Sequence, residues 1–225
     1  MNKISHDMEP HEIATYVKKA NPVILEIGCN DGTDTNKMLE TFPGASIHCF
    51  DPDPRAVERF KRTVSSDRVS LNEVAISESD GVAVFHGSSG QPPGKQRNND
   101  HYCRLLEWDL SGSLNVPTGH LKMSPWVTFP EDRQYEVETI RLDTWYRAAD
   151  IGEVDFIWAD VQGAEALLIS GASETLRHTE WFYTEYYSTP MYADQPNLEE
   201  IQKMLPNFKL VALYGTTNAL FKRIS

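Results

Sequence analysis

Residues 23–33 read Val-Ile-Leu-Glu-Ile-Gly-Cys-Asn-Asp-Gly-Thr, and this stretch decides the fold. An apolar run that contains one acid, Glu26, is followed by glycines at positions 28 and 32. The pattern predicts a buried strand that turns tightly into a helix, where the backbone can approach a nucleotide-sized ligand closely. The spacing Glu-x-Gly-x-x-x-Gly differs from the Gly-x-Gly-x-x-Gly that is typical of dinucleotide-binding dehydrogenases.

Strands and helices alternate along the chain on both sides of a long irregular segment. Apolar periodicity and capping residues predict the following elements: strands at 23–27, 46–50, 69–76, 82–86, 136–142, 155–160, 181–187, 208–214 and 219–223, and helices at 9–19, 33–42, 54–64, 163–170 and 197–205. Helices between strands indicate βαβ units and a parallel sheet, and the last two strands indicate an antiparallel hairpin at its end. The expected class is therefore α/β.

The whole chain, 1–225, is expected to form one domain. Residues 1–21 carry an N-terminal helix, and residues 87–134 interrupt the pattern with Gly, Pro, Asn, Ser and scattered aromatic residues. A structureless loop of that length is unusual in a compact domain. We therefore expect 87–134 to be an insertion or lid that faces the substrate.

Composition limits the partners. The chain has 225 residues and a net charge of −12, which disfavours nucleic acid and anionic membranes and fits a small-molecule substrate. There is no apolar run of about 20 residues and no apolar core of a secretory signal at the N-terminus, so we expect a cytoplasmic protein. Cys29, Cys49 and Cys103 lack metal-ligand spacing and are expected to be reduced packing thiols.

Acids and small residues stand at the expected strand ends. Asp51 follows the second strand, where it can accept hydrogen bonds from ribose hydroxyls; the alternative is a helix cap, a role for which Asp53 is better placed. At the third strand end, Ala75 and Ile76 would suit a flat base. Asn72 or Glu73 could bond the edge of that base, although all four can equally be ordinary strand residues.

The later strands also end in acids, Asp160 and Glu185. A carboxylate at the end of a buried strand is costly unless it is paired or used, and this end of an α/β sheet faces the ligand crevice. The two acids are therefore expected to meet at one pocket. Glu165, in the following helix, could face the same crevice or bond its own helix terminus.

Several of these motifs together resemble the FkbM family of methyltransferases. They are Leu-Glu-Ile-Gly-Cys-Asn-Asp-Gly, Phe-Asp-Pro-Asp-Pro, Thr-Ile-Arg-Leu-Asp-Thr-Trp, Val-Asp-Phe-Ile-Trp-Ala-Asp-Val-Gln-Gly-Ala-Glu with the following Ser-Gly-Ala, and the strand-final Glu185. Their order and spacing match across about residues 22–187. The Ser-Gly-Ser-Leu stretch at 111–114 matches a variable segment of that family more weakly.

The resemblance implies a Rossmann-like class I methyltransferase fold with a mostly parallel seven-stranded sheet. It also implies S-adenosylmethionine as methyl donor, S-adenosylhomocysteine as product, and O-methyl transfer to a sugar or natural product. The cofactor contacts expected from the motifs and strand ends are Glu26, Gly28, Cys29, Asn30, Asp31, Gly32, Asp51, Pro52, Ala75, Ile76 and Asp160. Asp31 replaces a commonly apolar residue, and Asp51 replaces the commoner Glu.

Methyl transfer to a hydroxyl requires alignment and a base within hydrogen-bond reach. The catalytic candidates are Asp160 and Glu185, with His120 or His101 from the long segment as further candidates for the base. Nothing in the spacing demands a metal, although the two acids with a third could hold Mg²⁺ through oxygen ligands.

Aromatic residues of the long segment and of the loop at 187–196 are candidates for binding the acceptor, or equally for packing within these loops. They are Trp108, Trp126, Tyr102, Tyr186, Tyr187 and Tyr192. Two other functions compete with methyl transfer: a nicotinamide-dinucleotide oxidoreductase and a non-catalytic Rossmann-like binding domain. The acceptor and the oligomeric state, a homodimer included, stay open.

Overall fold

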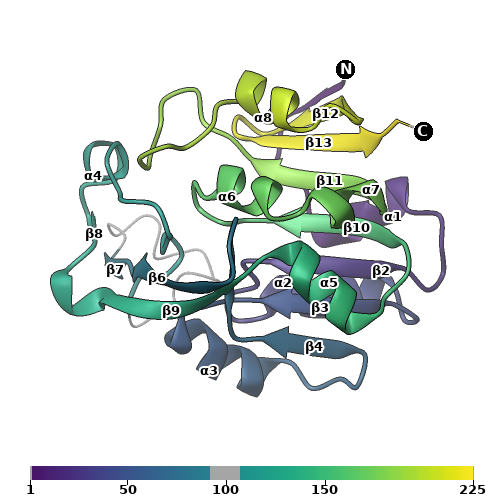
Figure 1. Cartoon of the computed structure of the whole chain (residues 1–225), viewed down its shortest axis with the longest axis horizontal. Helices are drawn as coiled ribbons and strands as arrows, with labels where there is room; N and C mark the ends of the chain where they lie inside the picture. The colour runs from purple at the N-terminus through teal and green to yellow at the C-terminus, as the bar shows by residue number, and fades with distance from the viewer. Residues whose placement is uncertain (1, 92–106, 225) are drawn as a thin grey trace.

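The computed structural model describes residues 2–91 and 107–224, which centre on an eight-stranded sheet (Figure 1). The strand order is β1-β12-β13-β11-β10-β2-β3-β4. β13 is antiparallel to both of its neighbours, and all other pairs are parallel. The strands are β1 (Asn2–Ile4), β2 (Val23–Ile27), β3 (Ser46–Phe50), β4 (Val69–Asn72), β10 (Val154–Ala159), β11 (Thr179–Glu185), β12 (Phe208–Tyr214) and β13 (Asn218–Arg223). The mostly parallel α/β sheet and its terminal hairpin are as predicted.

Two small sheets and several helices complete the fold. The second sheet has the order β5-β9-β6, from β5 (Ala75–Ile76), β9 (Gln134–Ile140) and β6 (Gly81–His86), and the third pairs β7 (Ser89–Gly90) with β8 (Val127–Thr128). The helices are η1 (Pro10–Glu12), α1 (Ile13–Tyr16), α2 (Thr33–Thr41), α3 (Pro54–Thr63), α4 (His120–Met123), η4 (Glu131–Arg133), α5 (Leu142–Ala149), α6 (Glu165–Ser170), α7 (Ser173–Arg177) and α8 (Leu198–Met204).

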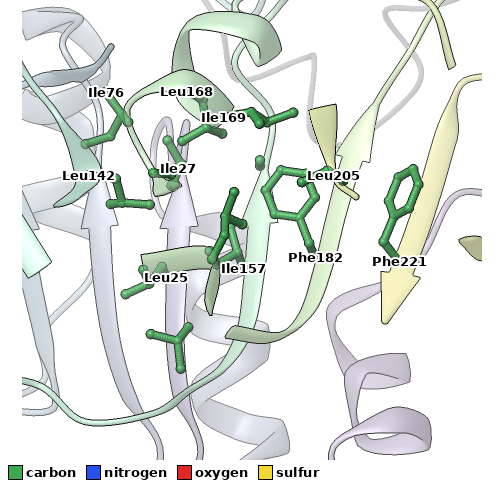
Figure 2. Packing of buried hydrophobic residues seen from close by; sticks show 14 of the residues in the cluster. Leu25, Ile27, Ile76, Leu142, Ile157, Leu168, Ile169, Phe182, Leu205 and Phe221 are labelled. Carbon is green, nitrogen blue, oxygen red and sulfur yellow. The ribbon is translucent and has the colours of Figure 1, made fainter. Parts of the chain in front are cut away.

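The core lies on both faces of the main sheet because alternate residues of each central strand point to opposite sides. Leu25 and Ile27 of β2 pack in one cluster with Ile157 of β10 and with residues of α5 and α6. Figure 2 shows these side chains beside Phe182 of β11 on the same face of the sheet. The residues that alternate with these along the strands point to the other face of the sheet, where they pack in a second cluster with α1, α2 and α3. Burial of both faces explains why the central strands are apolar runs.

The small sheets lie at the carboxyl ends of the parallel strands, on the left of Figure 1. The predicted third strand, 69–76, is in fact two strands: β4 stays in the main sheet, whereas β5 pairs with β9. β6 also pairs with β9, in antiparallel register from Gly81↔Thr139 to His86↔Gln134. The chain that precedes the expected lid is thus joined to the chain that follows it.

The N-terminal region differs from the expectation of one helix over 9–19. The helical part is short, η1 followed by α1, and Val17 is already extended. β1 adds an eighth strand by pairing in parallel with β12. Its three residues, Asn-Lys-Ile, are too few to show an alternating pattern, so periodicity could not predict this strand. The other expected helices of the described chain lie within two residues of their predicted bounds.

Candidate active site

A cavity of about 630 Å³ opens at the carboxyl ends of β2, β3, β10 and β11, between the main sheet and the segment that carries α4. Twelve of the predicted site residues line it: Glu26, Gly28, Cys29, Asn30, Asp31, Asp51, Pro52, Ala75, Ile76, His120, Asp160 and Glu185. Most of them follow β2, β3, β10 and β11, which are neighbours in the main sheet, so residues distant in sequence meet here.

The glycine turn after β2 has a left-handed backbone, with φ +90° at Gly28 and φ +78° at Gly32. A Cβ on Gly28 would lie 1.9 Å from the carbonyl oxygen of Asp160, so β2 and β10 can approach only if this residue has no side chain. Gly32 differs from the expectation of a cofactor contact. It is not among the cavity-lining residues, and a Cβ there would meet Val64 at 2.3 Å, so Gly32 permits helix packing.

Glu26 is a buried acid at the end of β2, with a 2% exposed side chain. The hydroxyl of Thr35 donates a 2.5 Å hydrogen bond to its Oε2, and the Cys49 thiol donates to the same oxygen at 3.5 Å. Burial raises the pKa of Glu26 to about 8, against the lowering effect of the Thr35 hydrogen bond. Glu26 can therefore change its protonation state when a cationic ligand enters the cavity.

Asp51 follows β3 and joins two pieces of backbone. Its Oδ2 accepts from the amide of Asn30 at 2.8 Å and its Oδ1 from the amide of Asp53 at 2.9 Å. Burial raises the pKa of Asp51 to about 7. Asp53 caps α3 by accepting from the amide of Arg55, so Asp51 is free of that role. Each oxygen of Asp51 keeps a lone pair for a ligand hydroxyl.

Of the four candidates near the end of the predicted third strand, 69–76, two line the cavity and two do not. Ala75 and Ile76 line the cavity, whereas Asn72 and Glu73 do not. Asn72 donates to the carbonyl oxygen of Cys49 at 3.0 Å and accepts from the indole of Trp145 at 3.0 Å. Glu73 forms a surface ion pair with Lys61 at 2.6 Å. Both side chains are engaged elsewhere, and this favours the alternative that Asn72 and Glu73 have structural roles.

Asp160 and Glu185 meet through a third residue, Gln162. The Gln162 amide nitrogen donates to Oδ1 of Asp160 at 2.6 Å and to Oε2 of Glu185 at 3.2 Å. Burial raises the pKa of Asp160 to about 6. Burial and then repulsion from Asp160 raise the pKa of Glu185 well above its ordinary value. The site thus holds a buried carboxyl pair in which both pKa values are raised, and such perturbed acids are typical of functional sites.

Gln162 lies within the Asp-Val-Gln-Gly-Ala-Glu motif, which by itself indicates no role for this residue. Its backbone has φ +49°, which an Asn or Gly adopts more readily than a Gln. This left-handed backbone conformation cannot be predicted from the sequence alone, and so the bridging position of the Gln162 amide was not predictable. Glu165 was left between two roles, and here it is fully buried and accepts from the amide of Gly163 at 3.2 Å at the start of α6. Burial raises the pKa of Glu165 to about 7.

His120 begins α4, on the long segment, and lines the same cavity as Asp160 and Glu185. Its ring lies edge-on to Phe129 and to Tyr192, with both centroid distances 5.6 Å, and it is 7% exposed. Burial lowers the pKa of His120, and its Nδ1 has no hydrogen-bond partner among the described residues. His120 is thus a neutral imidazole with one unused nitrogen. His101, the other histidine candidate, lies outside the described residues.

The aromatic candidates for the acceptor separate into two groups. Trp108, Trp126 and Tyr187 line the cavity, and the two indoles meet edge-to-face with centroids 4.7 Å apart. Tyr186 packs against the apolar core of the α5–α8 face, and Tyr192 is 1% exposed. Tyr102, like Cys103, lies outside the described residues.

The cysteines and acids of the described ranges show no metal-binding arrangement. Cys29 and Cys49 are buried and free, as expected of packing thiols. Within 2–91 and 107–224, no group of three His, Cys, Asp or Glu side chains is placed to hold a metal ion. In the same ranges no helix is long and apolar enough to cross a membrane.

A mostly parallel sheet with this strand order, a glycine turn after its central strand β2 and acids at the neighbouring strand ends define the Rossmann-like fold of class I methyltransferases. The sequence pattern of the family described as Methyltransferase FkbM domain matches residues 26–210. The chain belongs to this family of methyltransferases.

A curated relative is similar over most of the chain. The "2-O-methyltransferase NoeI" of Sinorhizobium fredii (strain NBRC 101917 / NGR234) is 44% identical over 204 residues, which are 90% of this chain and 79% of that protein. The relative's name describes transfer of a methyl group to an oxygen. It places the present chain beside methyltransferases rather than nicotinamide oxidoreductases.

Solved structures share the fold at low sequence identity. A "putative rRNA-methylase" from Clostridium thermocellum has a TM-score of 0.51 at 12% identity, over 96% of this chain and 93% of that one. A "putative O-methyltransferase" from Klebsiella pneumoniae has a TM-score of 0.50 at 12% identity, over 96% and 80%. Both similarities concern the fold alone.

Proposed function

We propose that this protein is an S-adenosylmethionine-dependent O-methyltransferase that acts on a hydroxyl of a small molecule, a sugar or a natural product. One observation carries the proposal: Asp160 and Glu185 stand on adjacent strand ends, bridged by one amide, at the wall of a cavity that Glu26 and Asp51 also line. The name of the 44% identical relative supports oxygen as the acceptor atom.

The donor set of the cavity fits this cofactor. The lining acids Glu26, Asp51 and Asp160 would repel a pyrophosphate, whereas they suit an ammonium group, ribose hydroxyls and a sulfonium. We assign Glu26 with the turn residues Gly28, Cys29, Asn30 and Asp31 to the amino-acid end of the cofactor. Asp51 and Pro52 would hold the ribose, and Ala75 and Ile76 would flank the adenine.

When bound, S-adenosylmethionine supplies an electrophilic methyl group on a positively charged sulfur. The protein's part is to align the acceptor oxygen with that group and to accept the hydroxyl proton. Asp160 is the first candidate for the base, since a pKa raised by burial to about 6 leaves it ionised at neutral pH. Glu185, whose pKa is raised by burial and by Asp160, is its partner at the same wall of the cavity. His120, neutral and with a free nitrogen, is the alternative base.

The acceptor side is built from indole and phenol rings. Trp108 and Trp126 present an edge-to-face pair, and Tyr187 lines the same cavity from the segment after β11. Aromatic faces pack well against the C–H surfaces of a saccharide, and this favours a sugar over a charged acceptor. The net charge of −12 disfavours nucleic acid as substrate. Cytoplasmic location and the single-domain organisation stay predictions from the sequence.

The proposal is tested by transfer of labelled methyl from S-adenosylmethionine to a panel of nucleotide sugars, free saccharides and phenolic natural products. We expect label on an oxygen of at least one saccharide, with inhibition by S-adenosylhomocysteine. Calorimetry with S-adenosylmethionine and with NAD provides the control, because binding of NAD alone would point to the oxidoreductase. Cofactor binding without transfer to any acceptor would favour a non-catalytic domain. Activity that survives excess chelator excludes a required Mg²⁺.

A further inference from the structure

Tyr192 lies between β11 and α8 and is held rigidly by its surroundings. Its side chain is 1% exposed, and its ring lies so close to Gly163 that a Cβ at that position would come within 2.6 Å of it. The His120 ring meets the same phenol ring edge-on. The amides of Met191 and Tyr192 both donate to the side-chain oxygen of Gln195, which fixes the backbone. The phenol oxygen therefore occupies one defined place.

That oxygen connects the two sides of the cavity. It donates to the carbonyl oxygen of Ser111 at 2.8 Å and to Oε1 of Gln162 at 3.3 Å. A phenol has a single proton, which is shared between these acceptors. Ser111 belongs to the long segment on the acceptor side, and Gln162 belongs to the loop after β10.

Gln162 has a carboxamide whose two ends face different partners. Its nitrogen donates to Asp160 and Glu185, so its oxygen must point away from the acids, toward Tyr192. If the amide rotated, its oxygen would face two carboxyl groups, with like partial charges in contact. The left-handed backbone at Gln162, φ +49°, brings the side chain back over its own loop to this position.

We propose that Tyr192 is a positioning residue, which holds the carboxamide of Gln162 so that its nitrogen stays bonded to both Asp160 and Glu185. This inference rests on the proposed role of the two acids in the site. The remaining charged groups that act on the pair are acidic: Asp34 of α2, Asp7 of the N-terminal segment and Glu165 of α6. The hydrogen bonds of Gln162 oppose all of them, and they lower the pKa of both acids.

The test compares affinities for S-adenosylmethionine and S-adenosylhomocysteine by calorimetry between pH 5.5 and 8.5. Only S-adenosylmethionine carries a sulfonium charge. The protein's preference for it over S-adenosylhomocysteine should therefore rise as the acid pair ionises. This readout needs no acceptor and no turnover. In Tyr192→Phe, which keeps the ring, we expect the rise to move to higher pH. Near pH 7 the preference should fall by about threefold to tenfold, as for loss of one hydrogen bond.

The matched control is Tyr146→Phe, because the Tyr146 hydroxyl also donates to a backbone carbonyl, that of Gly152 at 3.0 Å, but on α5. Its curve should coincide with that of the unmodified protein. A second variant, Gln162→Asn, tolerates the left-handed backbone and shortens the side chain. It should show the same shift, and adding Tyr192→Phe to it should have no further effect.

An unchanged curve in Tyr192→Phe overturns the positioning role and leaves the proposed cofactor intact. Additive shifts in the double variant also overturn it, because Tyr192 would then act by a route other than Gln162. If the unmodified protein binds S-adenosylmethionine and S-adenosylhomocysteine with a preference that does not change with pH, the acid pair does not act on the sulfonium. The positioning role of Tyr192 is then overturned as well. Failure to bind S-adenosylmethionine at all contradicts the proposed function itself, and the inference with it.

Discussion

The Asp51 carboxylate accepts a 2.8 Å hydrogen bond from the backbone amide of Asn30, so the acid after β3 holds the glycine turn after β2. Asn30 has φ +43°, and Asp51 stabilises this unusual backbone by satisfying its amide. The same carboxylate faces the cavity. The residue assigned to the ribose thus also shapes the turn that is assigned to the amino-acid end of the cofactor.

We expect Asp51→Asn to weaken S-adenosylmethionine binding by at least about tenfold, since the variant loses a charged acceptor and opposes an amide N–H with an NH₂ group. Calorimetry at pH 8, above the pKa of about 7, measures the effect. Asp150→Asn is the control, because Asp150 is exposed at the end of α5 with φ +49°, which Asn tolerates. Equal affinities in the two variants would remove Asp51 from the ribose site.

Asp160→Asn should reduce methyl transfer by about a hundredfold or more, the usual contribution of a general base, while the protein stays folded. The active form of Asp160 is the carboxylate. In the unmodified enzyme, kcat/KM should therefore fall as the pH drops through about 6. The pH–rate profile is measured with the acceptor found in the labelled-methyl screen.

The companion variant is Glu185→Gln, for which we expect a loss of rate with the acidic limb of the profile retained. Glu180→Gln, on the same strand β11 but in a surface pair with Lys222, is its control and should be fully active. Full activity of Asp160→Asn, with His120→Gln inactive, would transfer the role of base to His120.

Glu26 should make the ligand-free protein less stable at higher pH. A carboxyl whose folded-state pKa, about 8, exceeds its ordinary 4.5 keeps its proton longer when folded than when unfolded. The free energy of unfolding therefore falls as the pH rises from about 4.5 to 8. Between pH 5.5 and 7.5 the contribution of Glu26 is on the order of 2–3 kcal/mol. Urea unfolding of Glu26→Gln at both pH values should show a correspondingly smaller decrease, and an identical decrease would contradict the raised pKa.

Gly28→Ala should lower the free energy of unfolding by at least about 2 kcal/mol. The new Cβ would lie 1.9 Å from the carbonyl oxygen of Asp160, on a backbone with φ +90°. Gly152→Ala is the matched control, because a Cβ there meets nothing within 4 Å. Thermal melts of the two variants check this, and a melt of Gly28→Ala within a degree of the control would show that β2 and β10 can move apart.

The parts of the fold that follow from local patterns were predictable. Buried strands such as β2 and β10 are apolar runs, α3 begins at a Pro after the Asp53 cap, and α8 begins with the Asn197–Glu200 capping box. The acids at strand ends were predictable as cavity residues because the carboxyl ends of parallel strands face one crevice.

What the sequence did not reveal depends on partners distant in the chain. β5 leaves the main sheet because it pairs with β9, more than sixty residues later, and no local pattern reports this pairing. Asp143 lies in the first turn of α5, yet it accepts from the amides of Glu174 and Thr175 at α7, far along the chain. Gln162 and Tyr192 likewise become neighbours only through the tertiary fold.

The ladder between β6 and β9 has a consequence for how the acceptor side can vary. It joins His86 to Gln134 and thereby fixes the distance between the two ends of the intervening chain. The entropic cost of closing a loop whose ends are already paired grows only slowly with its length. Length changes in the stretch between these two residues should therefore cost little, provided that Ser111 and Asp109, which bond Tyr192 and Arg59, are kept. Chimaeras that keep Ser111 and Asp109 would present different acceptor pockets to one donor site.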